Sequence, residues 1–181
     1  MGGFFGAASR KSCKYDVFFG TDYHSHLGTK RGGLAFYDPG KGFQRQIHNI
    51  ENTPFRTKFE SDLEKFSGCY GLGCISDTDP QPLLVRSHLG LFAISTVGII
   101  TNAEELVEKT FSGPGYQFMA MSSGNVNATE LTAALINRCD NLIDGIRYAQ
   151  AAIEGSCTIL ILNQDGLIAA RDSMGRLPIV I

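Results

Sequence analysis

The sequence lacks several features that would place it in a specialised class of protein. It has no tryptophan, and 16 Lys and Arg against 18 Asp and Glu leave a formal net charge of −2. Without a basic excess, we expect no binding to nucleic acid or to an anionic membrane surface. No stretch approaches the ~20 consecutive apolar residues that a membrane span needs. The five cysteines form no CxxC pair, so neither a metal site nor a disulfide framework is expected.

What is present suits one globular domain. The 181 residues are 43% hydrophobic and 19% charged, and 21 of them are glycine, which favours a strand-rich fold with tight turns. The first residues, MGGFFGAASRKS, place their apolar run before their charges, the reverse of a secretory signal peptide. Gly6 stands where a myristoylation motif needs Ser or Thr. We therefore expect a cytoplasmic protein.

The order of predicted elements is strands, then helices, then strands. This order favours an α+β fold with two sheets over a dinucleotide-binding fold, and no GxGxxG, P-loop or HExxH motif is present. Residues 112–126, rich in Gly and Ser, are predicted to be a loop. The predicted strands are 2–9, 34–37, 43–48, 70–76, 83–85, 91–95, 158–162 and 167–170, and the predicted helices include 57–66, 102–107 and 142–153.

Two further helix predictions rest on particular residues. Phe19, Tyr23 and Leu27 recur at i, i+4 and i+8, which predicts one face of a helix that ends at Gly28. We expect Phe19 in the core. Asn127, followed three residues later by Glu, has the spacing of a capping box. The same spacing predicts that Asn102 caps the helix at 102–107.

An ordered set of short motifs indicates a function, which periodicity alone does not. The set covers essentially the whole chain: Gly3-Phe4-Phe5-Gly6, Arg31-Gly32, Gly71-Leu72-Gly73, Pro80-Gln81-Pro82, Gly98 with 102–106, Thr129-Glu130, 153–155 and 165–172. Together these motifs resemble the glutaminase domain of class II glutamine amidotransferases, in its amidophosphoribosyltransferase branch.

The resemblance implies both an architecture and an activity. The implied fold is a four-layer αββα sandwich of two antiparallel sheets, the N-terminal nucleophile hydrolase fold. Residues 1–181 would form one such domain at the start of a longer chain, with a phosphoribosyltransferase domain following Ile181. The family hydrolyses glutamine to glutamate and ammonia for purine biosynthesis, without a cofactor, and is commonly a homo-oligomer.

In the family, an N-terminal cysteine thiolate attacks the glutamine amide, and its own α-amine serves as the base. An Asn-Gly pair holds the oxyanion. By the resemblance, the nucleophile position is Gly2, which has no side chain, and the oxyanion pair is Val97-Gly98, where only the backbone donor remains. Arg31 and Gly32 match the family's Arg-Gly pair beside the nucleophile.

By the resemblance, the residues that bind glutamine are replaced as well. The family binds the α-carboxylate of glutamine with an Arg and its α-amine with an Asp. The corresponding positions here are Ser76 and Ala128. We therefore expect a glutaminase-like domain without glutaminase activity, whose less charged pocket disfavours a zwitterionic ligand.

Other candidates are weaker than their structural interpretations. Cys13, beside Lys11 and Lys14, and Cys74 are conceivable replacement nucleophiles, but no histidine is paired with either by sequence. Asp22 and His26 would share a helix face at i, i+4, yet the sequence offers no clear third metal ligand.

Three functional hypotheses remain open. The first is an enzyme of the amidophosphoribosyltransferase type with a degenerate glutaminase half, whose downstream domain uses free ammonia or another amine. The second is a non-catalytic module that binds a small ligand or a partner on the same fold. The third is an active glutamine-hydrolysing amidotransferase in which the residue correspondence above is wrong.

Overall fold

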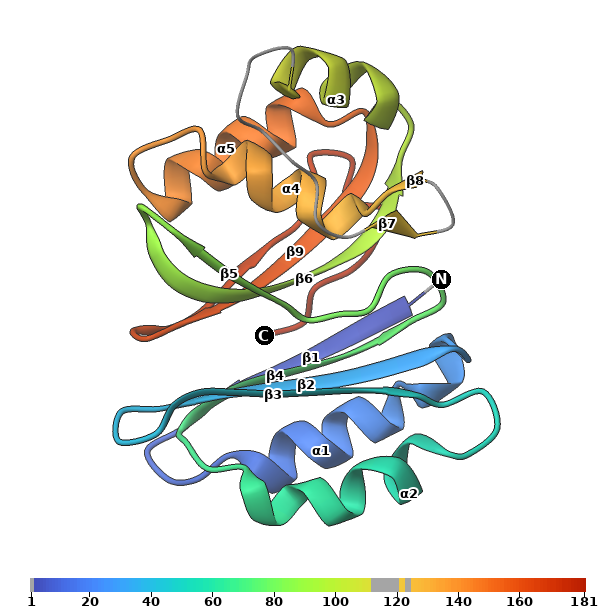
Figure 1. The fold of residues 1–181 in the computed structure, drawn as a ribbon, viewed down its shortest axis with the longest axis vertical. Helices are drawn as coiled ribbons and strands as arrows, with labels where there is room; N and C mark the ends of the chain where they lie inside the picture. Colours follow the sequence, from blue (N-terminus) through green and yellow to red (C-terminus); the bar gives the residue numbers. More distant parts are fainter. Residues whose placement is uncertain (1, 112–120, 123–124) are drawn as a thin grey trace.

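The structure is a computed structural model, which describes residues 2–111, 121–122 and 125–181. Two four-stranded antiparallel sheets face each other, and helices cover the outer face of each sheet (Figure 1). This arrangement is the four-layer αββα sandwich that the motifs implied, so the predicted fold class is confirmed.

The first sheet, drawn below the second in Figure 1, has the strand order β1-β4-β2-β3. Its outer face is covered by α1 and α2, each followed by a short 3₁₀ segment. The elements of this half are β1 Gly2–Ala8, α1 Lys14–Tyr23, η1 Ser25–Leu27, β2 Arg31–Asp38, β3 Gly42–Asn49, α2 Phe55–Phe59, η2 Glu60–Lys65 and β4 Tyr70–Ser76.

The second sheet has the order β10-β9-β6-β5 and carries α3, α4 and α5 on its outer face (Figure 1). A two-residue ladder, β7 with β8, lies within the segment predicted as a loop. The rest of that loop prediction, 112–120 and 123–124, lies outside the described residues. The elements of this half are β5 Leu83–Ser87, β6 Gly90–Ile100, α3 Ala103–Phe111, β7 Met121–Ser122, β8 Asn125–Val126, α4 Ala128–Ile136, α5 Leu142–Ala152, β9 Gly155–Asn163 and β10 Gly166–Ala170.

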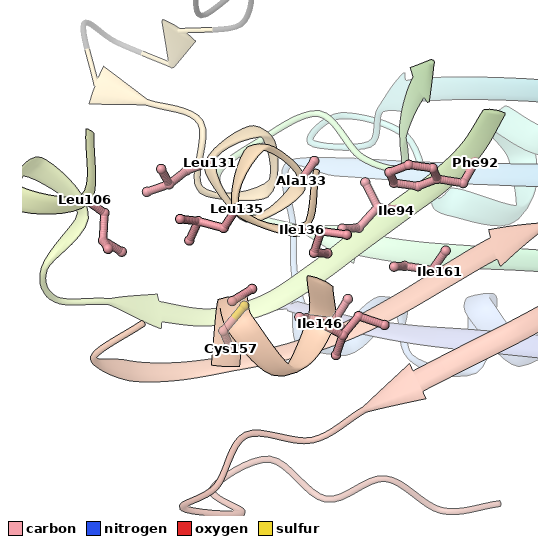
Figure 2. Close-up of a cluster of buried hydrophobic side chains, with 12 residues drawn as sticks. Phe92, Ile94, Leu106, Leu131, Ala133, Leu135, Ile136, Ile146, Cys157 and Ile161 are labelled. Atoms are coloured by element: carbon pink, nitrogen blue, oxygen red, sulfur yellow. The ribbon is translucent and has the colours of Figure 1, made fainter. Parts of the chain in front are cut away.

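Each pair of adjacent layers has its own hydrophobic core. Figure 2 shows the core of the second half, where Ile136 of α4 lies near Ile94 of β6, and Leu131 of α4 lies on the side of Leu106 of α3. The core between the sheets has aliphatic side chains at its buried centre, and partly buried aromatic rings pack against them. The buried residues are Ala35, Leu72, Ala93, Leu160 and Leu162. Side chains that are paired across neighbouring strands point to the same face of the sheet. At the ends of these strands, side chains on the inner face therefore point into the space between the two sheets.

The face predicted for α1 is wrong. Phe19, Tyr23 and Leu27 are 51%, 76% and 37% exposed, and Leu27 lies beyond the helix in the 3₁₀ segment. Asp22 and His26 are for the same reason not at helical spacing on one element.

The buried face of α1 consists instead of Val17, Phe18 and Thr21. Its position follows from β4, against which the helix packs. A Cβ built on Gly73 would lie 1.9 Å from Thr21 Oγ1, and one built on Gly71 would lie 3.1 Å from Val17 Cγ2. The glycines of β4 therefore admit the helix at close range, and the small side chains of α1 face them.

Most other element predictions are confirmed in type, with shifted ends. The predicted helix 57–66 is a short α-helix followed by a 3₁₀ segment, although Phe59, Leu63 and Phe66 are buried together as expected. Strands 34–37, 83–85 and 91–95 are all longer than predicted.

The two predicted caps differ in outcome. Asn127 caps α4, because its Oδ1 accepts hydrogen bonds from the Thr129 and Glu130 N–H groups. The Asn102 side chain instead ties α5 to β9, donating to the Ala152 carbonyl and accepting from the Glu154 N–H.

Candidate functional site

A cavity of about 290 Å³ opens at one end of the sandwich, where both sheets contribute residues. It is formed by the ends of β1, β4, β6 and β9, by the loop between β4 and β5, and by one residue of the C-terminal segment. None of the side chains that line it is ionisable, within the part of the chain that the structure describes. The lining residues are Gly2, Ile75, Ser76, Thr78, Gln81, Thr96, Val97, Gly98, Ile99, Ser156 and Leu177.

The first sheet aligns three of the sequence-predicted positions in one row. Gly2 of β1 is paired with Ser76 of β4, and Ser76 is paired with Arg31 of β2. Residues directly opposite each other in neighbouring strands point to the same face, here the face toward the second sheet. Gly2 and Ser76 line the cavity, whereas half-buried Arg31 does not.

At Gly2 there is neither a side chain nor room for one. A Cβ built on Gly2 would lie 2.4 Å from the carbonyl oxygen of Ile75. Contacts this short do not occur between real Cβ atoms and backbone oxygens. β1 or β4 would have to shift before any larger residue could occupy this position.

The second sheet brings Val97 and Gly98 to the same cavity on β6. Gly98 has φ of +151°, and a Cβ built on it would lie 2.0 Å from the Ser156 carbonyl oxygen on β9. Both the backbone conformation and the close approach of β9 require glycine here. Val97 adds an apolar side chain to the wall.

Ala128 and Gly32 lie away from the cavity wall. The Ala128 N–H donates to Oδ2 of Asp79 at 3.2 Å, at the first residue of α4. Thr129 Oγ1, one residue on, is 2.7 Å from Oγ1 of Thr96, which is a residue of the cavity wall. Gly32 is on the opposite face of β2, where it accommodates the ring of Phe55.

Three polar side chains of the wall are each held by a backbone N–H group. Gln81, 4% exposed, accepts from the Thr96 N–H through Oε1 at 2.8 Å. Ser156 Oγ accepts from the Ile99 N–H at 3.2 Å, and Ser76 Oγ accepts from the Thr78 N–H at 3.2 Å. Sequence reasoning included Gln81 only as part of a motif and missed Ser156, since no local pattern marks a residue that acts from a separate strand.

A second cavity of about 200 Å³ adjoins the first and shares Gly2, Val97 and Leu177 with it. Thr158 lines it, and the buried Oγ1 of Thr158 has no hydrogen-bond partner. His24 also lines this cavity. Burial, together with the nearby charge of His26, lowers the pKa of His24 below its usual value, which favours the neutral imidazole.

The cysteines do not contribute a thiol to either cavity wall among the described residues. Burial raises the pKa of Cys13 to about 11 and that of Cys74 to about 12. The Cys13 pKa is therefore raised, although Lys11 and Lys14 lie close to it in the sequence. Burial likewise raises the pKa of Cys157 to about 11, and such thiols are poor nucleophiles near neutral pH.

The conceivable metal ligands on α1 have other partners. Asp22 Oδ2 accepts from Arg56 Nη2 at 2.7 Å, and His26 Nδ1 lies 2.8 Å from the Tyr23 carbonyl oxygen. Over residues 2–111, 121–122 and 125–181, no three His, Cys, Asp or Glu side chains gather in a way that could hold a metal ion.

The sandwich of two antiparallel sheets between helical layers, with a cavity at the head of β1, is the architecture of the N-terminal nucleophile hydrolases. Among solved structures, the chain is similar to a glutamine phosphoribosylpyrophosphate amidotransferase from B. subtilis, complexed with ADP and GMP. The TM-score is 0.80 at 23% identity, over 97% of this chain and 38% of that one. An allosteric regulatory enzyme of purine biosynthesis gives a TM-score of 0.79 at 23% identity, over 95% of this chain and 37% of that one.

Sequence relatives point to the same group. The chain is 28% identical to the amidophosphoribosyltransferase of Methanocaldococcus jannaschii, over 100% of this chain and 40% of the relative. It is 25% identical to that of Archaeoglobus fulgidus, over 86% of this chain and 35% of the relative. The curated and structural neighbours thus point to the glutamine amidotransferase domain of amidophosphoribosyltransferases, the group that the motifs resemble. The chain spans about two fifths or less of the length of these relatives.

Two further findings complete the comparison. No family model matches the sequence. None of the helices that the structure describes is long and apolar enough to cross a membrane.

Proposed function

We propose that this domain belongs to an amidophosphoribosyltransferase-like protein and that it does not hydrolyse glutamine. One observation carries the proposal. The cavity where Gly2, Ser76 and Val97 meet offers no thiol, no carboxylate and no cation from the described residues that line it. In the resembling family, these are the positions of the nucleophile, the carboxylate-binding Arg and the oxyanion-binding Asn.

The physical cost of these replacements supports the proposal. Without a thiolate at Gly2, no covalent acyl intermediate forms there. Loss of a single oxyanion donor, as at Val97, lowers a rate by roughly 10²–10³. Each charged hydrogen bond missing from the glutamine grip, as at Ser76, weakens binding by roughly 1.5–3 kcal/mol.

The proposal extends to the rest of the protein. A phosphoribosyltransferase domain that follows residues 1–181 would take free ammonia or another amine, with this domain as its structural partner. The greater length of the relatives supports such an arrangement. A natural reading frame that continues into a strand with two acidic residues before a Gly- and Thr-rich phosphate loop would favour it over a free-standing binding module.

Glutamate release tests the loss of activity directly. Purified protein is incubated with saturating L-glutamine, and glutamate is measured by an enzyme-coupled assay beside an active class II glutaminase. We expect no release above the background of a heat-treated sample. Stoichiometric turnover that scales with protein concentration and survives repeated purification would contradict the proposal.

A glutamine-analogue electrophile tests the hypothesis of an active enzyme with another nucleophile. We expect intact-protein mass spectrometry to detect no adduct that excess glutamine suppresses, because burial raises the pKa of Cys13, Cys74 and Cys157 and no cysteine among the described residues lines the cavity. An adduct on one residue, suppressed by excess glutamine, would identify a nucleophile and overturn the proposal.

A further inference from the structure

We propose that the 290 Å³ cavity binds a small uncharged molecule with a hydrogen-bond-accepting head, a carbonyl group above all, on a short aliphatic body. The inference rests on the proposed function, because a glutamine-hydrolysing site would have to hold a zwitterion. It names the chemistry that the altered cavity selects.

The hydrogen bonds already made by the cavity wall determine which groups remain to donate or accept. The oxygens of Gln81, Ser156 and Ser76 each already accept a backbone N–H. The bond from Thr96 fixes which end of the Gln81 amide is oxygen, so its –NH₂ group is left to donate. The Ser156 hydroxyl proton is likewise available, whereas the Ser76 hydroxyl shares a hydrogen bond with Thr78 Oγ1 at 3.4 Å. Gln81 and Ser156 thus present donors to the cavity, and a carbonyl oxygen is the complementary group.

The rest of the cavity wall is largely aliphatic. Ile75, Val97, Ile99 and Leu177 line the cavity beside the donors. They match a branched aliphatic body, and burying it is favourable by roughly 25 cal/mol per Å² of apolar surface. A cavity of this size encloses a ligand of several heavy atoms with room for water.

The described wall carries no charge that could pair with a charged ligand. A buried ion needs a partner of opposite charge or a dense set of hydrogen bonds. No acidic side chain lines the described wall to receive an ammonium group. Arg31 shares a register row with Ser76 but is not part of the wall, so a carboxylate head would lose hydration without gaining an ion pair.

Three probes of nearly equal shape separate these heads: isovaleramide, isovalerate and isoamylamine. Each is titrated into ¹⁵N-labelled protein of residues 1–181, and shifts of the Gly98 and Ser156 amide signals are followed. We expect saturable shifts with isovaleramide at a Kd of the order of 1 mM, ordinary for a ligand of this size. We expect isovalerate and isoamylamine to bind at least about tenfold more weakly.

The variant Gln81→Glu tests the role of the donor. It retains an oxygen for the Thr96 N–H but replaces the –NH₂ group by a carboxylate oxygen. We expect isovaleramide to bind about tenfold more weakly and isoamylamine to become the preferred probe. The matched control is Gln44→Glu, because Gln44 Oε1 also accepts a backbone N–H, from Ser67, outside the cavity. It should leave all three affinities unchanged.

The outcomes separate the two proposals. Equal or tighter binding of isovalerate, an unchanged preference in Gln81→Glu, or no binding of any probe would overturn the inference. A misfolded Gln81→Glu protein, recognised by its amide spectrum, would leave the wild-type ranking of the three probes as the deciding result. Glutamate release from glutamine would overturn the proposed function whatever the probes do.

Discussion

The α-carbon of Gly2 faces the carbonyl oxygen of Ile75 so closely that a Cβ on Gly2 would lie 2.4 Å from it. The pairing of β1 with β4 sets this distance, since Gly2 lies opposite Ser76, the next residue of β4. Position 2, to which the resemblance assigns the nucleophile, is therefore closed to a side chain as well as lacking one. A cysteine at this position would first require β1 or β4 to move.

The first prediction concerns that restoration. We expect Gly2→Cys alone to release no glutamate from glutamine, because the new side chain meets the backbone of β4. In addition, Ser76 offers no cation to bind the α-carboxylate, and the Val97 side chain offers no donor to the oxyanion. We also expect Gly2→Cys to lower the free energy of unfolding by about 1–3 kcal/mol, the usual cost of overpacking. Glutamate release and urea denaturation measure the two effects.

Gly3→Cys is the control for overpacking. A Cβ on Gly3 would lie 2.9 Å from the Cδ1 atom of Leu27, the far end of a flexible side chain that is 37% exposed. It should cost less than Gly2→Cys. Glutaminase activity in Gly2→Cys would mean that Ser76 and Ala128 do not correspond to the family's binding residues.

The second prediction concerns Gly98, which forms the cavity wall by its backbone. Gly98→Ala should lower the free energy of unfolding by at least about 2 kcal/mol, because backbone strain at φ +151° and the 2.0 Å contact with Ser156 act together. Thermal and urea denaturation measure the loss.

Gly42→Ala separates strain from contact. Gly42 has φ of +76°, but a Cβ built on it meets nothing within 4 Å. Its substitution should cost only the ~1–2 kcal/mol of left-handed backbone strain. Equal losses at Gly98 and Gly42 would show that β6 and β9 separate easily at the cavity.

The third prediction concerns pH and the ion cluster at Asp62. Burial disfavours the charged carboxylate, but hydrogen bonds from Lys65 and His48, each 2.6 Å long, outweigh it and hold the Asp62 pKa below its usual value. A lowered folded pKa means that the unfolded chain takes up the proton first as the pH falls. The stabilisation is complete above the unfolded pKa of ~3.9 and is lost as the pH falls through the folded pKa.

We therefore expect Asp62→Asn to lower the free energy of unfolding by about 1–3 kcal/mol at pH 7, with the difference from the wild type shrinking below about pH 4. Urea denaturation at intervals from pH 6 to pH 2.5 measures it. Asp140→Asn, at an exposed position, is the control. A difference that stays constant down to pH 2.5 would contradict the proposed coupling.

Sequence patterns predicted best where the interaction is local. Asn127 caps α4 as its spacing indicated, because a cap needs only the two or three residues that follow it. The strands predicted at 158–162 and 167–170 are also confirmed, as β9 and β10, because a four-residue turn sets their register. Helical periodicity failed for α1 because Phe19 and Tyr23 are at helical spacing on a face that no other layer covers.

By itself, the sequence determined the order of elements, the α+β class and, through its ordered motifs, the resemblance to amidophosphoribosyltransferase glutaminase domains. These depend on local propensity and on residue identity, which a single chain displays directly. Only the tertiary structure decided that Gly2, Ser76, Val97 and Gly98 surround one cavity while Ala128 stands apart. It alone showed that Gln81 and Ser156 add donors there, because strand register and the stacking of two sheets join residues far apart in the chain.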